Sequence, residues 1–155
     1  MAESQKKQAW VTSLRLLAAS PKSRKELAFK LTDKGYEEGV IQEILDNLER
    51  QGILSDRSYG RNLVARFVQG QPSGRRKIAF ELKRHGLPSS IQEELLGELN
   101  PEEEIARAEE LAGARWERLK NFPIEKRRKR VYDFLIRRGF DFQIVRDILE
   151  KFEHA

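Results

Sequence analysis

Apolar residues recur along the chain at the three- and four-residue spacing of amphipathic α-helices. Trp10, Leu14 and Leu17 form a first stripe of this kind, which ends before Pro21. Runs with alternating apolar and polar residues and paired turn residues, which would indicate β-hairpins, do not occur in the sequence. The pattern therefore predicts an all-α protein.

Three segments align on a shared glycine, and their apolar positions coincide at helical spacing. They are residues 25–48, 76–99 and 129–152, aligned on Gly35, Gly86 and Gly139. Each glycine is predicted to stop a helix, because the position after a helix end favours the left-handed backbone that glycine adopts most easily. The residue after each glycine is apolar, as is the residue four before it, which is typical of this ending. Each segment is therefore predicted to be two helices joined by a turn.

Start signals for helices agree with this interpretation. Ser23 with Glu26 and Ser89 with Gln92 form capping-box patterns, and Asn100 precedes a proline and three glutamates. Ser55 is predicted to cap another helix, which continues through Phe67. About nine helices result, in three tandem three-helix repeats over residues 1–54, 55–99 and 100–155. Because a repeat of this size is only marginally stable alone, we expect neighbouring repeats to support each other in an elongated array.

Composition excludes several classes of protein. The 155 residues are 39% hydrophobic and 35% charged and contain no cysteine, which excludes disulfides, thiolate metal sites and cysteine nucleophiles. Apolar runs fall far short of the ~20 residues of a membrane span, and the N-terminus lacks a signal-peptide stretch. We expect a cytoplasmic monomer that needs no membrane and no cofactor. No phosphate-binding loop or catalytic triad pattern is visible, so an enzyme is not predicted.

The net charge of +5 conceals two strongly basic blocks. Residues 57–86 carry eight basic and one acidic residue, and residues 113–138 carry ten and three. Candidate contacts with phosphates or an acidic partner are Arg57, Arg61, Arg66, Arg75, Arg76, Lys77, Lys83 and Arg84 in the first block, and Arg115, Arg118, Lys120, Lys126, Arg127, Arg128, Lys129 and Arg130 in the second. The alternative for both sets is a solvated helix face.

Aromatic, histidine and acidic residues add little chemistry. Core packing is the preferred interpretation for the aromatic residues on the apolar stripes, Phe29, Tyr36, Phe80, Phe134, Phe140 and Phe152. Trp116, between two arginines, is the candidate for stacking on single-stranded bases. His85 is predicted to cap a helix or lie at the surface, and His154 to fray. Glu102, Glu103 and Glu104 are predicted to complement a helix dipole, because adjacent helical side chains cannot converge on one metal ion.

The pattern from Ser23 to Leu87 resembles the bacterial RecX family, which modulates the recombinase RecA. The resemblance rests on Ser23-Arg24-Lys25-Glu26-Leu27, the Lys34-Gly35-Tyr36 turn, Gln51-Gly52-Ile53-Leu54, and Gly74-Arg75-Arg76-Lys77-Ile78. It implies three tandem three-helix repeats. It also implies binding along the groove of RecA filaments on single-stranded DNA, with inhibition of ATP hydrolysis, strand exchange and repressor cleavage in DNA repair and the SOS response.

A second interpretation is a stand-alone protein that binds single- or double-stranded DNA through one of the helix–turn–helix units and the basic patches. The second helices of these units, near residues 42–47, 92–98 and 146–150, are largely acidic or neutral. A helix that reads the major groove presents Arg, Lys or Asn to base edges, so the sequence favours the recombinase regulator.

Overall fold

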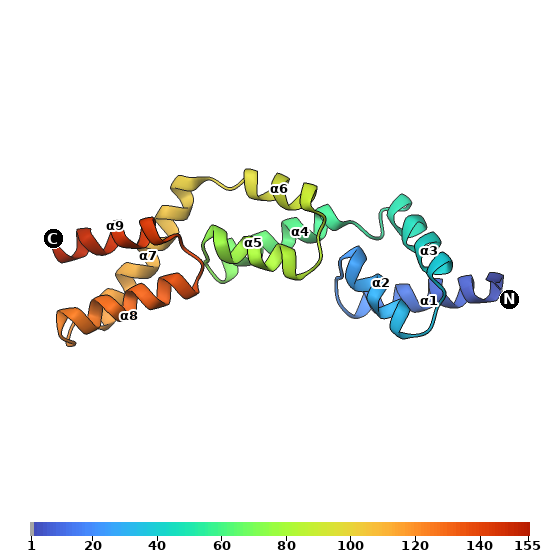
Figure 1. The fold of residues 1–155 in the computed structure, drawn as a ribbon, viewed down its shortest axis with the longest axis horizontal. Helices are drawn as coiled ribbons and strands as arrows, with labels where there is room; N and C mark the ends of the chain where they lie inside the picture. Colours follow the sequence, from blue (N-terminus) through green and yellow to red (C-terminus); the bar gives the residue numbers. More distant parts are fainter. Residues whose placement is uncertain (1) are drawn as a thin grey trace. The chain divides into compact units, whose positions relative to one another are not determined.

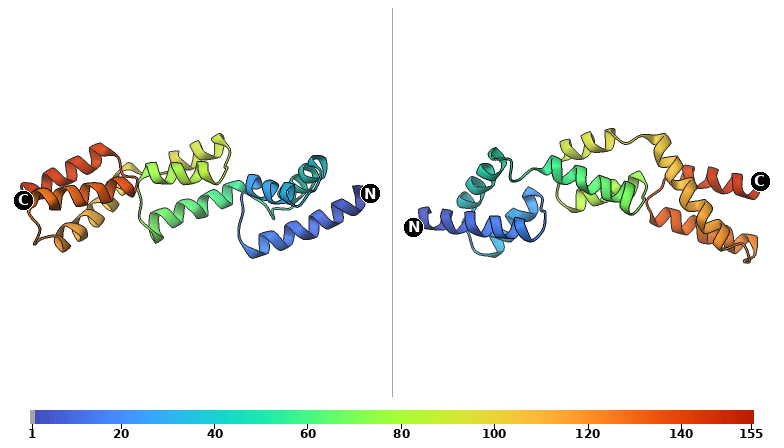
Figure 2. Two further views of the ribbon diagram at one scale, coloured as in Figure 1. Left: turned by 60° about the horizontal axis from the view of Figure 1, so that its bottom comes forward. Right: turned by 180° about the vertical axis from the view of Figure 1, so that it is seen from behind.

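The computed structural model describes residues 2–155, which form nine α-helices and no β-strand. Figures 1 and 2 show the helices in chain order. Their bounds are α1 Ala2–Ala19, α2 Arg24–Asp33, α3 Glu38–Arg50, α4 Asp56–Ala65, α5 Arg75–Arg84, α6 Ser89–Gly97, α7 Pro101–Arg118, α8 Ile124–Arg137 and α9 Phe142–Glu153. A π-helical turn, η1 Arg66–Gly70, continues α4. The all-α prediction is therefore confirmed.

The chain divides into two compact units. The N-terminal unit contains residues 2–62 and 82–92, and the C-terminal unit contains residues 63–81 and 93–155. Helices α4, α5 and α6 contribute residues to both units. The repeat boundaries at residues 54 and 99 stay a prediction.

Each unit has an apolar core built from one group of three helices. In the N-terminal unit, α1, α2 and α3 bury the stripe residues, with Leu27, Leu31, Leu45 and Leu48 completely inaccessible to solvent. In the C-terminal unit, α7, α8 and α9 enclose Val131, Leu135, Phe140, Val145, Ile148 and Leu149. Small residues, Ala108 and Ala112, line the inner face of α7 and let the neighbouring helices approach closely.

The helix starts predicted from capping residues follow the expected chemistry, with one exception. Ser23 and Glu26 form the capping box of α2, and the Asn100 side chain accepts the Glu102 backbone N–H at 2.8 Å. Ser55 accepts the Ser58 N–H at 3.2 Å. The capping box predicted at Ser89 and Gln92 is wrong: Ser89 is already the first residue of α6, and the Gln92 amide donates to the Leu87 carbonyl.

The three shared glycines all have positive φ, between 78° and 92°. The backbone N–H of the residue after each glycine donates to the carbonyl five residues earlier, which joins Tyr36 to Leu31, Leu87 to Leu82, and Phe140 to Leu135. These bonds satisfy helix-end carbonyls that would otherwise lack a partner. Each glycine therefore stops a helix.

Within the N-terminal unit, the first turn of α2 is seated on the turn between α5 and α6. The Ser23 hydroxyl donates to the His85 carbonyl at 2.6 Å. The stem of Lys25 lies on Gly86, where an added Cβ would be 2.7 Å from Lys25 Cδ and 2.9 Å from its Cβ. The Arg24 backbone N–H donates to a buried carboxylate, Asp56 of α4, at 2.8 Å. Burial raises the pKa of Asp56, and this bond only partly offsets the effect.

Within the C-terminal unit, the first turn of α5 is seated in the same way on the turn between α8 and α9. The Gly74 N–H donates to the Arg138 carbonyl at 2.8 Å, and the Arg76 N–H donates to the Gly139 carbonyl at 3.1 Å. An added Cβ on Gly139 would collide with the backbone of Lys77. The Arg75 N–H donates to Glu104 of α7 at 2.6 Å.

These two contacts, which we call the seating contacts, use equivalent positions. The residues 24 and 75 correspond in the aligned repeats, as do Gly86 and Gly139. In each contact a carboxylate from the following repeat accepts the first N–H of a helix, where the helix dipole favours negative charge. Glu104 is buried and accepts the Arg75 N–H at the start of α5. The prediction that Glu104 complements the dipole of its own helix, α7, missed this second role.

Alanine substitutions at the glycines will separate backbone strain from the seating contact. Gly35→Ala meets no atom within 4 Å and costs only the left-handed backbone, about 1–2 kcal/mol of unfolding free energy. Gly86→Ala will cost more, because Lys25 must move, and Gly139→Ala will cost most, because Lys77 backbone blocks the Cβ. Urea unfolding followed by circular dichroism measures these differences.

The control is Gly39→Ala in α3, which has open space and ordinary helical backbone, so alanine should be neutral or stabilising. Equal losses at all three turn glycines would contradict the seating contacts as a source of stability.

Candidate nucleic-acid and protein interface

The first predicted basic set is distributed over both compact units. Arg57, Arg61, Lys83 and Arg84 belong to the N-terminal unit, and Arg66, Arg75, Arg76 and Lys77 belong to the C-terminal unit. All are exposed except Lys77, which is half-buried and pairs with buried Glu81 at 3.2 Å. Arg75 also donates to the Leu96 carbonyl at 2.6 Å, so its guanidinium is fixed.

The N-terminal unit contains a pocket of about 620 Å³ between α2 and the α5–α6 turn. Five of its lining residues are cationic: Lys22, Lys25, Lys30, Lys83 and Arg84. Glu26 is the one carboxylate among the lining residues that the structure describes. Of these cations, the sequence prediction included only Lys83 and Arg84. The other three were missed because they come from an electrically neutral stretch of sequence.

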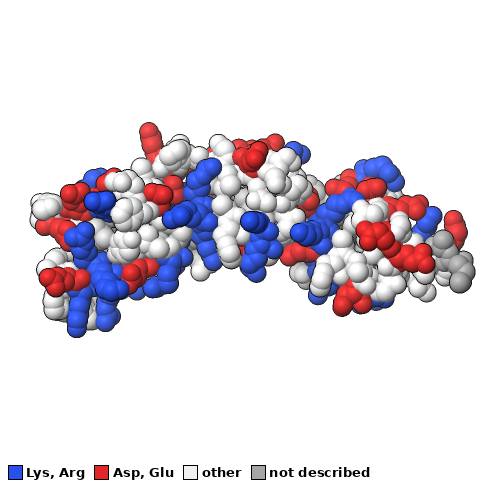
Figure 3. Space-filling view, viewed as in Figure 1, with Lys and Arg blue, Asp and Glu red and all other residues white. Residues whose placement is uncertain are grey.

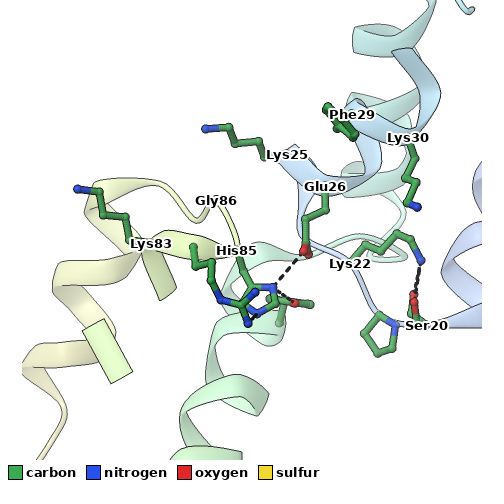
Figure 4. A pocket seen from close by; sticks show the side chains of 12 residues that line it. Ser20, Lys22, Lys25, Glu26, Phe29, Lys30, Lys83, His85 and Gly86 are labelled. Carbon is green, nitrogen blue, oxygen red and sulfur yellow. Dashed lines mark hydrogen bonds and ion pairs between the residues drawn. The ribbon is translucent and has the colours of Figure 1, made fainter. Parts of the chain in front are cut away.

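The pocket floor is a network centred on His85, whose Nδ1 lies 3.0 Å from Glu26 Oε2 and 2.9 Å from the Tyr59 hydroxyl oxygen (Figure 4). Arg84 Nη2 lies 3.3 Å from His85 Nε2. Because a guanidinium only donates, Nε2 accepts and Nδ1–H donates to Glu26. The His85 side chain is only 17% exposed and links α5 to Glu26 of α2. The predicted role of His85 as a helix cap or surface residue is therefore wrong.

Glu26 is held in its ionised form by this network. Burial alone would raise the pKa of Glu26, but hydrogen bonds from the Ser23 backbone N–H, His85 and Tyr59 outweigh burial and lower it. Both carboxylate oxygens are therefore engaged inside the protein, Oε1 by Ser23 and Oε2 by His85.

The second predicted basic set lies on the end of α7, the following turn and the first half of α8, all in the C-terminal unit. Lys and Arg side chains gather in this region of the space-filling view (Figure 3). Exposed cations here are Arg118, Lys120, Lys126, Arg128, Lys129 and Arg130. We call these six residues the α7–α8 basic surface.

The two remaining arginines of this set are packed against aromatic rings. Arg127 lies 3.9 Å from the Trp116 ring centroid and donates to the Trp116 carbonyl, and Arg115 lies 3.9 Å from the Phe134 centroid. Burial, together with the charges of Arg118, Arg137 and Arg138, lowers the pKa of Arg115. Trp116 also contacts Phe152 and is half-buried, so it does not offer the free ring face expected of a stacking platform.

The exposed aromatic rings lie elsewhere. Phe29 is 71% exposed and Phe80 is 59% exposed, which contradicts the prediction that both pack in the core. Phe140 is fully buried, as predicted, and Tyr36, Phe134 and Phe152 are half-buried. The aligned repeats contain a signal for the error: Phe29 and Phe80 occupy equivalent positions, and the third repeat has Asp133 there. A charged residue at this position indicates a solvent-facing side.

Residues 2–155 contain no group of three or more acidic or histidine side chains suited to hold a metal ion. Glu102 and Glu103 are exposed, whereas Glu104 turns inward to α5. In the same residues, no helix combines the length and the apolar character needed to cross a membrane.

Comparison with known proteins identifies the family. Residues 9–48 match the family model of the first three-helix domain of RecX, and residues 102–149 match that of its third three-helix domain. Regulatory protein RecX of Chlorobium limicola is 32% identical over 151 residues, which cover 97% of this chain and 93% of that protein. Regulatory protein RecX of Mycobacterium sp. strain KMS is 33% identical and covers 92% of this chain and 80% of that protein.

Solved structures share the fold. The crystal structure of RecX from Lactobacillus salivarius has a TM-score of 0.86 at 20% identity and covers 99% of both chains. A crystal structure of a regulatory protein RecX has a TM-score of 0.82 at 23% identity, covering 94% of this chain and 73% of that chain. Fold and surface define an all-α protein of three-helix repeats that carries exposed cationic surfaces. The chain belongs to the RecX family of regulatory proteins.

The ionised state of Glu26 predicts a specific loss of stability in acid. A lowered pKa means that the stabilisation is present above the ordinary value of 4.5 and disappears as the pH falls through the lower, folded-state value. Between about pH 7 and about pH 3, the wild-type protein should therefore lose more unfolding free energy than Glu26→Gln. Asp56 titrates in the opposite sense but is present in both proteins, so the difference isolates Glu26.

Urea unfolding at several pH values provides the measurement. Glu38→Gln, which removes an exposed carboxylate from α3, is the control and should follow the wild-type pH dependence. Parallel curves for wild type and Glu26→Gln would contradict the network.

Proposed function

We propose that this protein binds RecA filaments on single-stranded DNA and inhibits RecA ATP hydrolysis, strand exchange and repressor self-cleavage. Membership of the RecX family over 97% of the chain is the observation that carries the proposal. The protein acts in this proposal as a monomeric binding module without cofactor or catalysis, in the cytoplasm, where the recombinase and the DNA are found.

The α7–α8 basic surface supports an electrostatic contribution to this binding. Lys126 and Arg130 are like charges one helical turn apart. Positions 125–129 hold four cations and one acid, Glu125, so the net charge near the start of α8 opposes the helix dipole. Three ion pairs partly compensate: Lys120 with Glu117, Lys129 with Asp133, and Arg128 with the half-buried Glu153. Pairs at the protein surface contribute little to stability. A surface that lowers the stability of its own helix is better explained by an anionic partner, either DNA phosphate or acidic protein.

The surfaces of the third helices weigh against a stand-alone reader of double-stranded DNA. Exposed carboxylates occur on α3 (Glu43, Asp46), α6 (Glu93, Glu94) and α9 (Asp147, Glu150). Carboxylates repel the phosphates that flank the major groove, so none of these helices has the surface of a recognition helix.

The test is DNA-dependent ATP hydrolysis by RecA, measured while this protein is titrated in at a low ratio to RecA, with single-stranded DNA in excess. Inhibition well below one molecule per RecA subunit supports the proposal, because competition for abundant free DNA does not produce it. Inhibition only when the DNA is saturated would instead favour the stand-alone DNA-binding protein.

Removing charge from the α7–α8 basic surface should weaken this inhibition. In the variant Lys126→Gln, Arg128→Gln, Lys129→Gln, Arg130→Gln, Arg127 is kept because it packs on Trp116. The concentration for half-inhibition should rise at least about tenfold, and its salt dependence should become shallower. Circular dichroism should show unchanged helicity, since all four side chains are exposed.

A matched variant removes the same charge from the N-terminal unit: Lys7→Gln, Arg15→Gln, Lys34→Gln, Arg50→Gln, all at exposed positions. This control should inhibit nearly as well as wild type. Equal weakening in both variants would mean that net charge alone acts, and would remove the assignment to the α7–α8 basic surface.

A further inference from the structure

We propose that the pocket between α2 and the α5–α6 turn binds single-stranded DNA directly, with a base stacked on Phe29 and the adjoining phosphates held by Lys25, Lys30 and Lys83. The inference rests on the proposed function only in taking single-stranded DNA as the ligand. It concerns binding by this protein alone, without a recombinase.

The pocket presents positive charge that the protein itself leaves uncompensated. Within residues 2–155, no carboxylate pairs with Lys25, Lys30 or Lys83. Glu26 contributes one negative charge to the pocket, but its two oxygens accept hydrogen bonds from Ser23 and His85, and none of these three lysines pairs with it. Five cations against one carboxylate leave this concave surface with a net positive charge, which attracts an anionic ligand.

The cations lie on two sides of the pocket, which suits a chain of phosphates better than a single anion. Figure 4 shows Lys25 and Lys83 extending on one side, with Lys22 and Lys30 on the other. Lys22 is fixed by donating to the Leu16 carbonyl at 2.9 Å and to the Ser20 carbonyl and hydroxyl at 3.2 and 2.8 Å. It therefore supplies charge at the rim and has no remaining N–H donor.

Phe29 supplies the surface that distinguishes a nucleotide strand from other anions. It lines the pocket on α2, between Lys25 and Lys30 in sequence, with 71% of the residue exposed. A single exposed apolar residue is common on protein surfaces and carries no inference alone. An exposed flat ring flanked by cations is the arrangement that stacks a base while its phosphates bind the charges.

An acidic peptide fits the same surface less well. Lysine ammonium groups bind phosphates and carboxylates alike, so the four lysines among the five cations do not separate the two ligands. The exposed ring of Phe29 does separate them, because a base stacks on an aromatic face and an aspartate or glutamate side chain does not. We therefore assign the pocket to a single strand of DNA.

The test measures binding of a fluorescently labelled oligothymidylate to the full-length protein by anisotropy, without RecA. Phe29→Leu keeps apolar bulk but removes the ring, and should weaken binding by about 5- to 150-fold, the range for loss of one stacked base. Phe29→Trp keeps a stacking face and should bind within about twofold of wild type. Unchanged binding by Phe29→Leu would overturn the proposal.

The lysines are tested through the salt dependence of binding, which a merely structural role would not alter. Lys25→Gln, Lys83→Gln keeps the stem that packs on Gly86 and should reduce the slope of log affinity against log salt concentration by about 1.4, or 0.7 per lost phosphate contact. The control pair Lys7→Gln, Lys34→Gln, outside the pocket, should leave the slope nearly unchanged. Equal slopes for the two pairs would overturn the assignment.

Competition experiments distinguish the ligand source. Thymidine monophosphate and oligoglutamate should each displace the labelled strand only at concentrations far above that of unlabelled oligothymidylate. If the mononucleotide displaces the strand as effectively as oligothymidylate does, the ligand is a free nucleotide. If oligoglutamate does so, the ligand is an acidic peptide. Either result overturns the proposal. ATP hydrolysis by RecA is assayed separately, so loss of strand binding in Phe29→Leu supports this site whether or not the protein inhibits RecA.

Discussion

The seating of a helix start on the glycine turn of the following repeat is the contact on which the rest of the structure depends. It occurs twice, with α2 on Gly86 and α5 on Gly139. A side chain at the turn glycine would occupy the space of the Lys25 stem in the first case and of the Lys77 backbone and Cβ in the second. A carboxylate from the following repeat, Asp56 or Glu104, accepts the first N–H of the seated helix. A small three-helix group buries little surface and is marginally stable alone, so this contact adds stability from the neighbouring repeat.

The same contact also organises the chemistry of the N-terminal unit. Seating α2 on the α5–α6 turn brings Glu26 to His85, residues 59 positions apart in sequence. The oxygens of this carboxylate then accept internal hydrogen bonds, while the lysines from α2 and α5 remain directed toward solvent around Phe29. Structural and electrostatic roles are therefore divided between neighbouring side chains: the acid and the histidine hold the repeats together, and the lysines make the surface positive.

Local signals made the helices and their ends predictable, and distant contacts account for what was missed. Gly35, Gly86 and Gly139, with the capping residues Ser23 and Asn100, act within a few residues and are visible as spacing. The roles of Asp56 and Glu104 depend on partners 32 and 29 positions away, and periodicity contains no information about them. The prediction placed Phe29 and Phe80 in the core because each is an apolar residue next to the apolar stripe of its helix. The one sequence signal that this side of the helix faces solvent is Asp133, which stands at the equivalent position of the third repeat.

The central claim is that the partner of this RecX-family protein is the recombinase filament rather than DNA alone. It is tested most directly by comparing the affinity of the labelled protein for RecA filaments assembled on single-stranded DNA with its affinity for the same DNA without RecA, at one salt concentration. The account predicts at least about tenfold tighter binding to the filament, a difference of about 1.4 kcal/mol. Equal or weaker binding to the filament would contradict it.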